Sequence, residues 1–147
     1  MNDVKQDKFF DLAVFQANLF SKDPDKKVCA LFIDPDSLHI LSTGYNGMPR
    51  NIDEEDEKRW ERPQKYKYVV HAEANGIYNA CRSGVSLDKS ICLVTFFPCS
   101  DCTKGIIQVG VKELVTPEPD FKNVKYGEDF KYSIEMLKEA KVMITYI

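Results

Sequence analysis

Two short segments of this 147-residue sequence carry side chains that could hold a metal ion and move protons. The first is His71-Ala72-Glu73, and the second is Pro98-Cys99-Ser100-Asp101-Cys102. One imidazole and two thiolates are ligands suited to zinc, and three protein ligands leave the fourth tetrahedral position open, as in catalytic zinc sites. The residues therefore predict a catalytic zinc site with His71, Cys99 and Cys102 as its ligands.

Glu73 supplies this predicted site with a proton carrier. Zinc lowers the pKa of bound water toward neutrality, and a neighbouring carboxylate can accept the released proton and pass it on to a substrate. In an ideal helix Glu73 would point about 200° away from His71. The two side chains can therefore reach one site only if the helix is just starting at His71.

Two helices must bring these residues together. Apolar residues at helical spacing predict the first over residues 70–82, and the second is expected over residues 99–109. Cys99 and Cys102 are three apart, about 300° around a helix axis, so both sulfurs can face one point. The positive ends of the helices would favour the thiolate forms.

The rest of the chain predicts an α/β fold. A helical stripe covers residues 9–20 and a further helix residues 128–140, while strands are expected at 27–34, 39–43, 90–97, 111–116 and 142–147. The later strand-helix-strand alternation indicates parallel strands with helices on both faces. We expect a three-layer α/β/α sandwich with a central five-stranded mixed sheet, and one domain over residues 1–147.

Residues 48–68 form a charged insertion in this pattern. Its length is compatible with an ordered segment containing a little helix or with a mobile loop, and Trp60 is its one large apolar anchor. Its basic residues could bind a phosphate, but they alternate with acidic residues, so a solvated ion-paired face is an equal alternative. The candidates for such a contact are Arg50, Arg59, Arg62, Lys65 and Lys67.

Composition narrows the class of protein. Hydrophobic residues make up 44% and charged residues 29%, which is typical of a globular domain, and the net charge of −3 opposes bulk binding to nucleic acid. Neither an apolar run of about 18 residues nor a secretory signal is present, so we expect a cytoplasmic protein without a membrane span. Cys29, Cys81 and Cys92 lie in apolar segments and are expected to be buried thiols.

The chain resembles the deoxycytidylate deaminase family of the cytidine deaminase superfamily. The resemblance is carried by residues 44–49 (Gly-Tyr-Asn-Gly-Met-Pro), 71–75, 97–102 and 106–113, in the family's order, and it covers residues 27 to 130. It includes the signature of zinc nucleobase deaminases, His-x-Glu followed by Pro-Cys-x-x-Cys, in which the glutamate is not a ligand.

The resemblance implies a cytidine-deaminase-type sandwich that converts deoxycytidine monophosphate (dCMP) to deoxyuridine monophosphate (dUMP) and ammonia. Zinc-activated hydroxide would attack cytosine C4 while Glu73 shuttles the proton. It further implies that Asn46 contacts the sugar, that the Ala72 backbone helps hold the pyrimidine, and that Tyr126 lies near the substrate phosphate. Arg50 and Lys125 are additional candidates for phosphate or effector contacts.

Family members also suggest a homo-oligomer, with a hexamer favoured, that deoxycytidine triphosphate (dCTP) activates and deoxythymidine triphosphate (dTTP) inhibits. Mg²⁺ would accompany such a nucleotide effector. Some members hold a second, structural zinc with Cys and His residues of the insertion. Residues 40–70 contain neither, so one zinc per chain is predicted.

Four other functions remain alternatives. A deaminase that also or mainly uses dCTP is open, because no motif separates monophosphate from triphosphate. An RNA adenosine deaminase shares the zinc chemistry but would need a basic strand-binding surface. A non-catalytic zinc or effector-binding protein would not need Glu73. A redox Cys-x-x-Cys protein would instead require a reversible Cys99–Cys102 disulfide and no metal.

Overall fold

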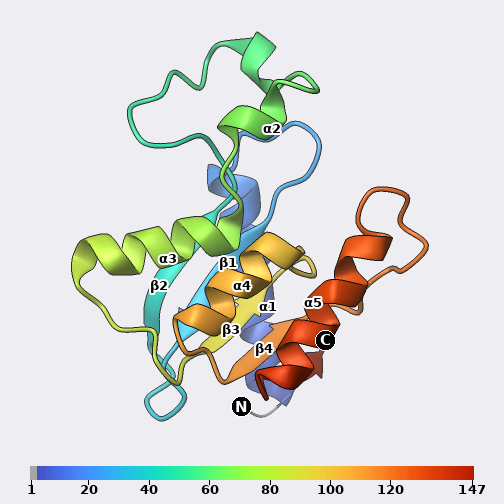
Figure 1. Ribbon diagram of the computed structural model, residues 1–147. Helices are drawn as coiled ribbons and strands as arrows, with labels where there is room; N and C mark the ends of the chain where they lie inside the picture. Colours follow the sequence, from blue (N-terminus) through green and yellow to red (C-terminus); the bar gives the residue numbers. More distant parts are fainter. Residues whose placement is uncertain (1–2) are drawn as a thin grey trace.

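A five-stranded mixed sheet forms the centre of the molecule, in a computed structural model that describes residues 3–147 (Figure 1). In sheet order, the strands are β2 (Ile40–Tyr45), β1 (Cys29–Ile33), β3 (Ile91–Val94), β4 (Glu113–Thr116) and β5 (Met143–Tyr146). β1 is antiparallel to both β2 and β3, whereas β3, β4 and β5 are parallel. The predicted mixed sheet is confirmed.

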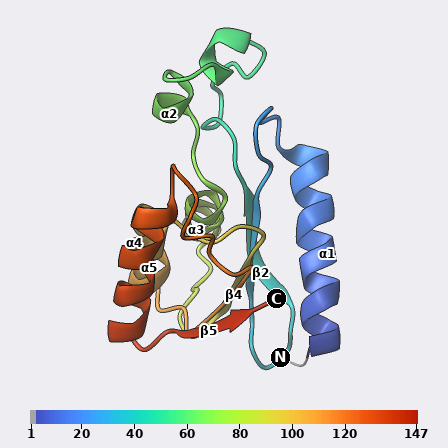
Figure 2. The same cartoon turned by 90° about the vertical axis from the view of Figure 1, so that its right-hand side faces the viewer.

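Helices cover both faces of this sheet. Helix α1 (Asp3–Phe20) lies on one face, and α3 (Ala72–Ser83), α4 (Ser100–Gln108) and α5 (Gly127–Glu139) lie on the other, as Figure 2 shows. The three-layer α/β/α sandwich is therefore also confirmed. Within residues 3–147, none of the helices combines the length and apolar character needed to cross a membrane.

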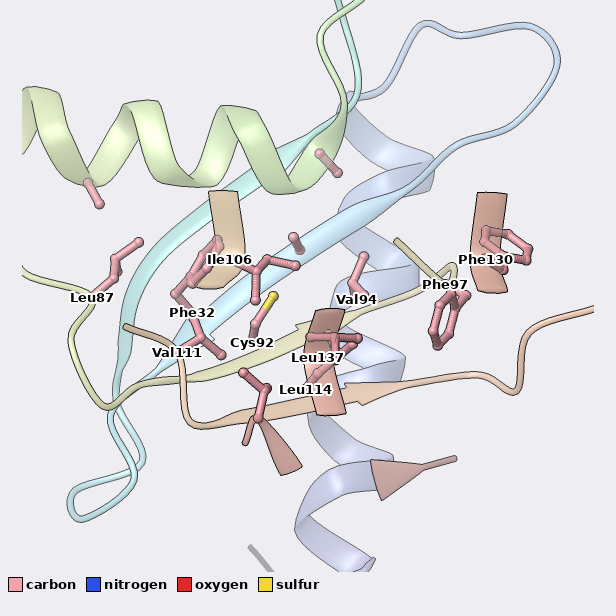
Figure 3. Packing of buried hydrophobic residues seen from close by; sticks show 14 residues of the cluster. Phe32, Leu87, Cys92, Val94, Phe97, Ile106, Val111, Leu114, Phe130 and Leu137 are labelled. Carbon is pink, nitrogen blue, oxygen red and sulfur yellow. The ribbon is translucent and has the colours of Figure 1, made fainter. Parts of the chain in front are cut away.

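The apolar run of β1 divides between two cores. All five residues of this strand are buried. Cys29, Leu31 and Ile33 join α1 in one cluster, and Ala30 and Phe32 join the cluster under α3, α4 and α5. Figure 3 shows Phe32 and Ile106 of this second cluster between the sheet and the helices. A strand buried on both faces explains the continuous apolar sequence.

Two glycines set the position of α3 on the sheet. A Cβ atom at Gly44 in β2 would lie 2.2 Å from the Gly76 nitrogen and 2.3 Å from the Ala72 carbonyl oxygen. No other residue fits so close to a helix backbone. The start of α3 is thus fixed directly against β2, and with it the His71–Glu73 segment.

This close packing also corrects one expectation about α3. Ala72, Gly76 and Ala80 face inward, while Tyr78 and Cys81 are exposed on the opposite side. Small residues occupy the buried face because the helix lies almost against the strand. The prediction that Cys81 is buried was therefore wrong, whereas Cys29 and Cys92 are buried as expected.

The charged insertion contains two short helices and closes on itself. These are η1 (Glu57–Trp60) and α2 (Lys65–Tyr68). Gly47 and Val70, just outside the insertion, exchange two backbone hydrogen bonds of 3.1 and 2.8 Å. Its two ends therefore meet at one β-bridge, and Figure 1 shows the insertion projecting beyond the end of the sheet.

Candidate active site

The three predicted metal ligands converge at the starts of two helices. His71 is the N-cap residue of α3 and Cys99 is the N-cap residue of α4, both with extended backbone, while Cys102 lies in the first turn of α4. The His71 Nδ1 atom lies 3.4 Å from the Cys99 Sγ and 3.5 Å from the Cys102 Sγ. All three ligand atoms lie within 4.8 Å of one another.

This triangle has the dimensions of a zinc site. Zn–N and Zn–S bonds of about 2.0 and 2.3 Å at tetrahedral angles place nitrogen and sulfur about 3.5 Å apart. The separations of 3.4 and 3.5 Å in the structure agree with that value. Among residues 3–147 this is the one group of His, Cys, Asp or Glu side chains with such convergence.

Glu73 satisfies the constraint that the sequence imposes on it. Because His71 precedes α3 in extended conformation, Glu73, the second residue of the helix, can share its site. The Glu73 side chain is nearly inaccessible, and this burial raises the pKa of its carboxyl group to about 6. A carboxyl group with such a pKa can both accept and release protons near neutral pH.

The two thiols share a proton when no metal is bound. The hydrogen bond from Cys102 lowers the pKa of Cys99 to about 4, and a bond to His71 adds to this effect. The same sulfur–sulfur bond raises the pKa of Cys102. Zinc binding would replace the shared proton, because thiolates are the ligand form.

A cavity of about 590 Å³ opens in front of this group, a size typical of small-molecule sites. It lies where β3 ends, since Phe96 and Phe97 line it, and the carboxyl ends of parallel strands are the usual place for a site in such sheets. We call the residues His71, Glu73 and Cys99 its metal wall. Four basic side chains that also line it are called the charged wall: Lys26, Arg62, Lys65 and Lys125.

Two cations of the charged wall are already neutralised by carboxylates. The Lys65 Nζ atom lies 2.6 Å from an oxygen of Asp23 and 2.8 Å from one of Asp25, and the Lys65 side chain is only 9% exposed. Arg62 pairs with Asp25 at 2.9 Å. These contacts join the insertion to the loop before β1. Arg62 and Lys65 are thus ion-paired, but with acids outside the insertion, and the Lys65–Asp23 pair is buried and not part of a solvated face.

The other two cations have aromatic partners instead. The Lys26 Nζ atom lies 3.3 Å from the ring centre of Phe96, and that of Lys125 lies 4.1 and 4.6 Å from the rings of Tyr66 and Tyr126. Throughout the described chain, no carboxylate forms an ion pair with either lysine. Both ammonium groups therefore keep their charge available to a ligand.

Asn46 lines the cavity, but its amide is fully engaged by the chain. Its Oδ1 accepts hydrogen bonds from the Val28 nitrogen at 2.8 Å and from the Ser21 hydroxyl at 2.9 Å. Its Nδ2 donates to Asp23 and to the Lys26 carbonyl oxygen, at 3.0 and 2.8 Å. Asn46 therefore shapes the loop that carries Lys26.

The remaining predicted residues divide between two places. Ala72, Lys125 and Tyr126 line the same cavity as the metal wall. Arg50 does not: its guanidinium donates to Asn79, and it lines a separate cavity of about 340 Å³. The sequence did not identify Lys26 as a site residue, because a lysine in a loop after Asp-Pro-Asp belongs to no recognisable motif. The only signal for it was its position just before a buried strand.

Comparison with known proteins agrees with this geometry. The sequence profile described as "Cytidine and deoxycytidylate deaminase zinc-binding region" matches residues 3–118. A probable deoxycytidylate deaminase of Drosophila melanogaster is 40% identical over 65% of this chain, and that of Caenorhabditis elegans is 37% identical over 95%. The matched regions span 50% and 68% of the lengths of these relatives.

A solved structure extends the likeness to the whole fold. The dCMP deaminase of cyanophage S-TIM5, crystallised with dCMP and dUMP, superposes with a TM-score of 0.79 and 25% sequence identity. The match covers 100% of this chain and 99% of the phage enzyme. The ligand triangle, the buried glutamate and the matched profile together show that this chain belongs to the cytidine and deoxycytidylate deaminase family.

Proposed function

We propose that this protein hydrolyses the amino group of dCMP, giving dUMP and ammonia. The observation that carries the proposal is one cavity that joins a zinc-type ligand triangle and a buried glutamate to two unpaired lysines. The residues proposed to perform deamination and those proposed to bind the phosphate thus line the same cavity. The similarity to deoxycytidylate deaminases of two animals and a phage supports the same substrate.

The metal wall would perform the chemistry. His71, Cys99 and Cys102 would hold zinc, and the chemistry that zinc supplies when bound is the activation of water as a nucleophile. Glu73 would take a proton from the attacking water and give it to the ring nitrogen next to cytosine C4. It would then take a second proton from the hydroxyl group now on C4 and give it to the amine, whose bond to C4 breaks to release ammonia. Its burial keeps competing water away, and the Ala72 backbone beside it would hold the pyrimidine.

The charged wall favours a monophosphate. A phosphate monoester carries a charge of about −2 near neutral pH, which Lys26 and Lys125 together balance. A triphosphate would need further cations, but Arg62 and Lys65 are already paired with Asp23 and Asp25. We therefore favour dCMP over dCTP as the substrate. Tyr126, stacked on Lys125, would lie at the phosphate, and Asn46 would be near the sugar.

The remaining features of the proposal follow the family. We propose one zinc per chain and a homo-oligomer, with a hexamer favoured, in the cytoplasm. dCTP, together with Mg²⁺, would activate the enzyme and dTTP would inhibit it. The single ligand triangle within residues 3–147 supports the zinc stoichiometry.

A substrate panel tests the proposal directly. Purified zinc-loaded protein would be given deoxycytidine, dCMP, dCTP and cytidine monophosphate, with ammonia release as the measurement. We expect the highest kcat/KM with dCMP. The Glu73→Gln protein, which lacks the proton carrier, serves as the control for contaminating deaminases. Higher kcat/KM with dCTP, or no ammonia from any cytosine nucleotide, would contradict the proposal.

A further inference from the structure

Helix α5 holds the turn that carries the cysteine ligands at two points. The Asp129 carboxylate accepts hydrogen bonds from the Ser100 backbone nitrogen at 2.7 Å and from the Ser100 hydroxyl at 2.6 Å. One turn later, the Ser133 hydroxyl donates to the Pro98 carbonyl oxygen at 3.0 Å. Residues four apart share one face of a helix. Together they hold the residues on both sides of Cys99.

The start of α4 needs such an external partner. The first backbone N–H groups of a helix have no acceptor within the helix, and the N-cap side chain normally supplies one. Here the N-cap residue is Cys99, which makes no side-chain capping bond and whose sulfur belongs to the ligand triangle. The Asp129 carboxylate takes over the capping role from another helix, where its charge also suits the helix dipole.

Helix α5 is rigidly placed for this task. Ser133 is fully buried, and the Phe130 ring packs against Phe97 with ring centres 5.1 Å apart, as the two labelled side chains in Figure 3 show. Phe130 also stacks on Tyr126, the residue just before the helix, at 5.9 Å. One packed element therefore connects the cysteine turn to the residue proposed to lie at the phosphate.

We infer that Asp129, assisted by Ser133, is a positioning residue for the metal ligands: it sets the Cys99–Cys102 turn in the geometry that zinc requires. The inference rests on the proposed zinc site. Both carboxylate oxygens of Asp129 accept hydrogen bonds from Ser100. Because Asp129 also lines the cavity, its role toward the metal ligands is read from zinc binding and not from turnover.

Zinc affinity tests this role without relying on turnover. Asp129→Ala removes both acceptors, and we expect the zinc Kd, measured by competition with a chromophoric chelator, to rise about 10-fold to 100-fold, the range for lost partners of metal ligands. In cobalt-substituted protein the thiolate-to-cobalt absorption should change as well. Asp129→Asn keeps an acceptor for the Ser100 nitrogen, and should recover most of the affinity and the wild-type cobalt spectrum.

Glu128→Ala is the matched control, because it removes an exposed carboxylate, paired with Lys131, from the same turn of α5. It should leave both measurements at wild-type values. An Asp129→Ala protein that matches this control in zinc Kd and cobalt spectrum would overturn the inference. If that variant does not fold, Ser133→Ala replaces it: a several-fold rise in zinc Kd supports the positioning role, and an unchanged Kd overturns it.

The same experiments separate this inference from the proposed function. Wild-type protein that binds no zinc would overturn both. Wild-type protein that binds zinc and depends on Asp129 for its affinity, but releases no ammonia from dCMP, would reject the proposed substrate and keep the positioning role.

Discussion

The metal wall and the charged wall of the cavity are built in different ways. Residues of the metal wall lie at the starts of α3 and α4, within two short sequence segments whose local geometry determines where their side chains point. The charged wall instead depends on partners far apart in sequence: Lys65 pairs with Asp23 across 42 positions. The backbone at the two helix starts thus directs the side chains of the proposed chemistry, while packing against β2 and α5 places those starts; the proposed recognition depends on long-range ion pairs.

Removing a metal ligand should have the largest effect. Cys99→Ala leaves only His71 and Cys102, which is too few for a stable zinc site. We expect the purified variant to hold little zinc and to lose deaminase activity completely. Elemental analysis of the purified protein is the measurement, and Cys81→Ala, an exposed thiol outside the site, is the control. A full complement of zinc in Cys99→Ala would contradict the ligand assignment.

Changing the proton carrier should separate metal binding from catalysis. Glu73→Gln preserves shape but cannot accept a proton, so we expect kcat to fall at least about 100-fold while zinc content stays at the wild-type level. Steady-state ammonia release and metal analysis on the same preparation test this. Near-normal turnover in this variant would show that the metal wall works without an acid–base residue.

Among the four basic residues of the charged wall, Lys65 should contribute most to the stability of the fold. Lys65→Met leaves Asp23 buried without its cation, and breaking a fully buried pair costs about 3–5 kcal/mol. We expect a smaller loss of unfolding free energy, about 2 kcal/mol, because Asp23 keeps hydrogen bonds from Asn46 and two backbone nitrogens. Urea denaturation measures it, with the exposed Lys67→Met as control. Equal stability of the two variants would show that the pair does not hold the insertion.

The unpaired lysines should affect substrate affinity more than fold. Lys26→Ala and Lys125→Ala each remove one charged partner of the proposed phosphate, worth about 1.5 kcal/mol, so KM for dCMP should rise about 10-fold. Exposed Lys27, which does not line the cavity, provides the control as Lys27→Ala. Deoxycytidine, which lacks the phosphate, should show little change in KM. An equal loss for both substrates would place the phosphate elsewhere.

The burial of Glu73 should make the stability of the metal-free protein depend on pH. The pKa of this carboxyl group rises from 4.5 to about 6 on folding, so the folded state keeps its proton while the unfolded state loses it. The raised pKa therefore stabilises the folded state most below pH 4.5. This contribution to the free energy of unfolding falls as pH rises through 6, by about 2 kcal/mol in all. Denaturation of wild type and Glu73→Gln across this range measures the difference. A constant difference between the two proteins would contradict the raised pKa.

The sheet, the helices that cover it and the ligand triangle could be predicted from the sequence. Hydrophobic periodicity indicates the helices and strands, and two short motifs indicate the ligands. The requirement that α3 begin at His71 was stated from helix geometry alone and is met. The partners of Arg62 and Lys65 could not be predicted, since nearby acids of the insertion are plausible partners but the actual ones, Asp23 and Asp25, lie far away in the sequence. Lys26 and Asp129 were missed for the same reason: their roles come from contacts with segments distant in the chain.

The bridge between Gly47 and Val70 has a consequence for how this protein could diversify. Because the entry and exit points of the insertion are already hydrogen-bonded to each other, the part before Arg62 and Lys65 can change in length with little effect on the backbone that leads into α3. Related enzymes could in this way acquire new substrate preferences through changes in the charged insertion alone. The same junction offers protein engineers a natural place to graft loops from related enzymes.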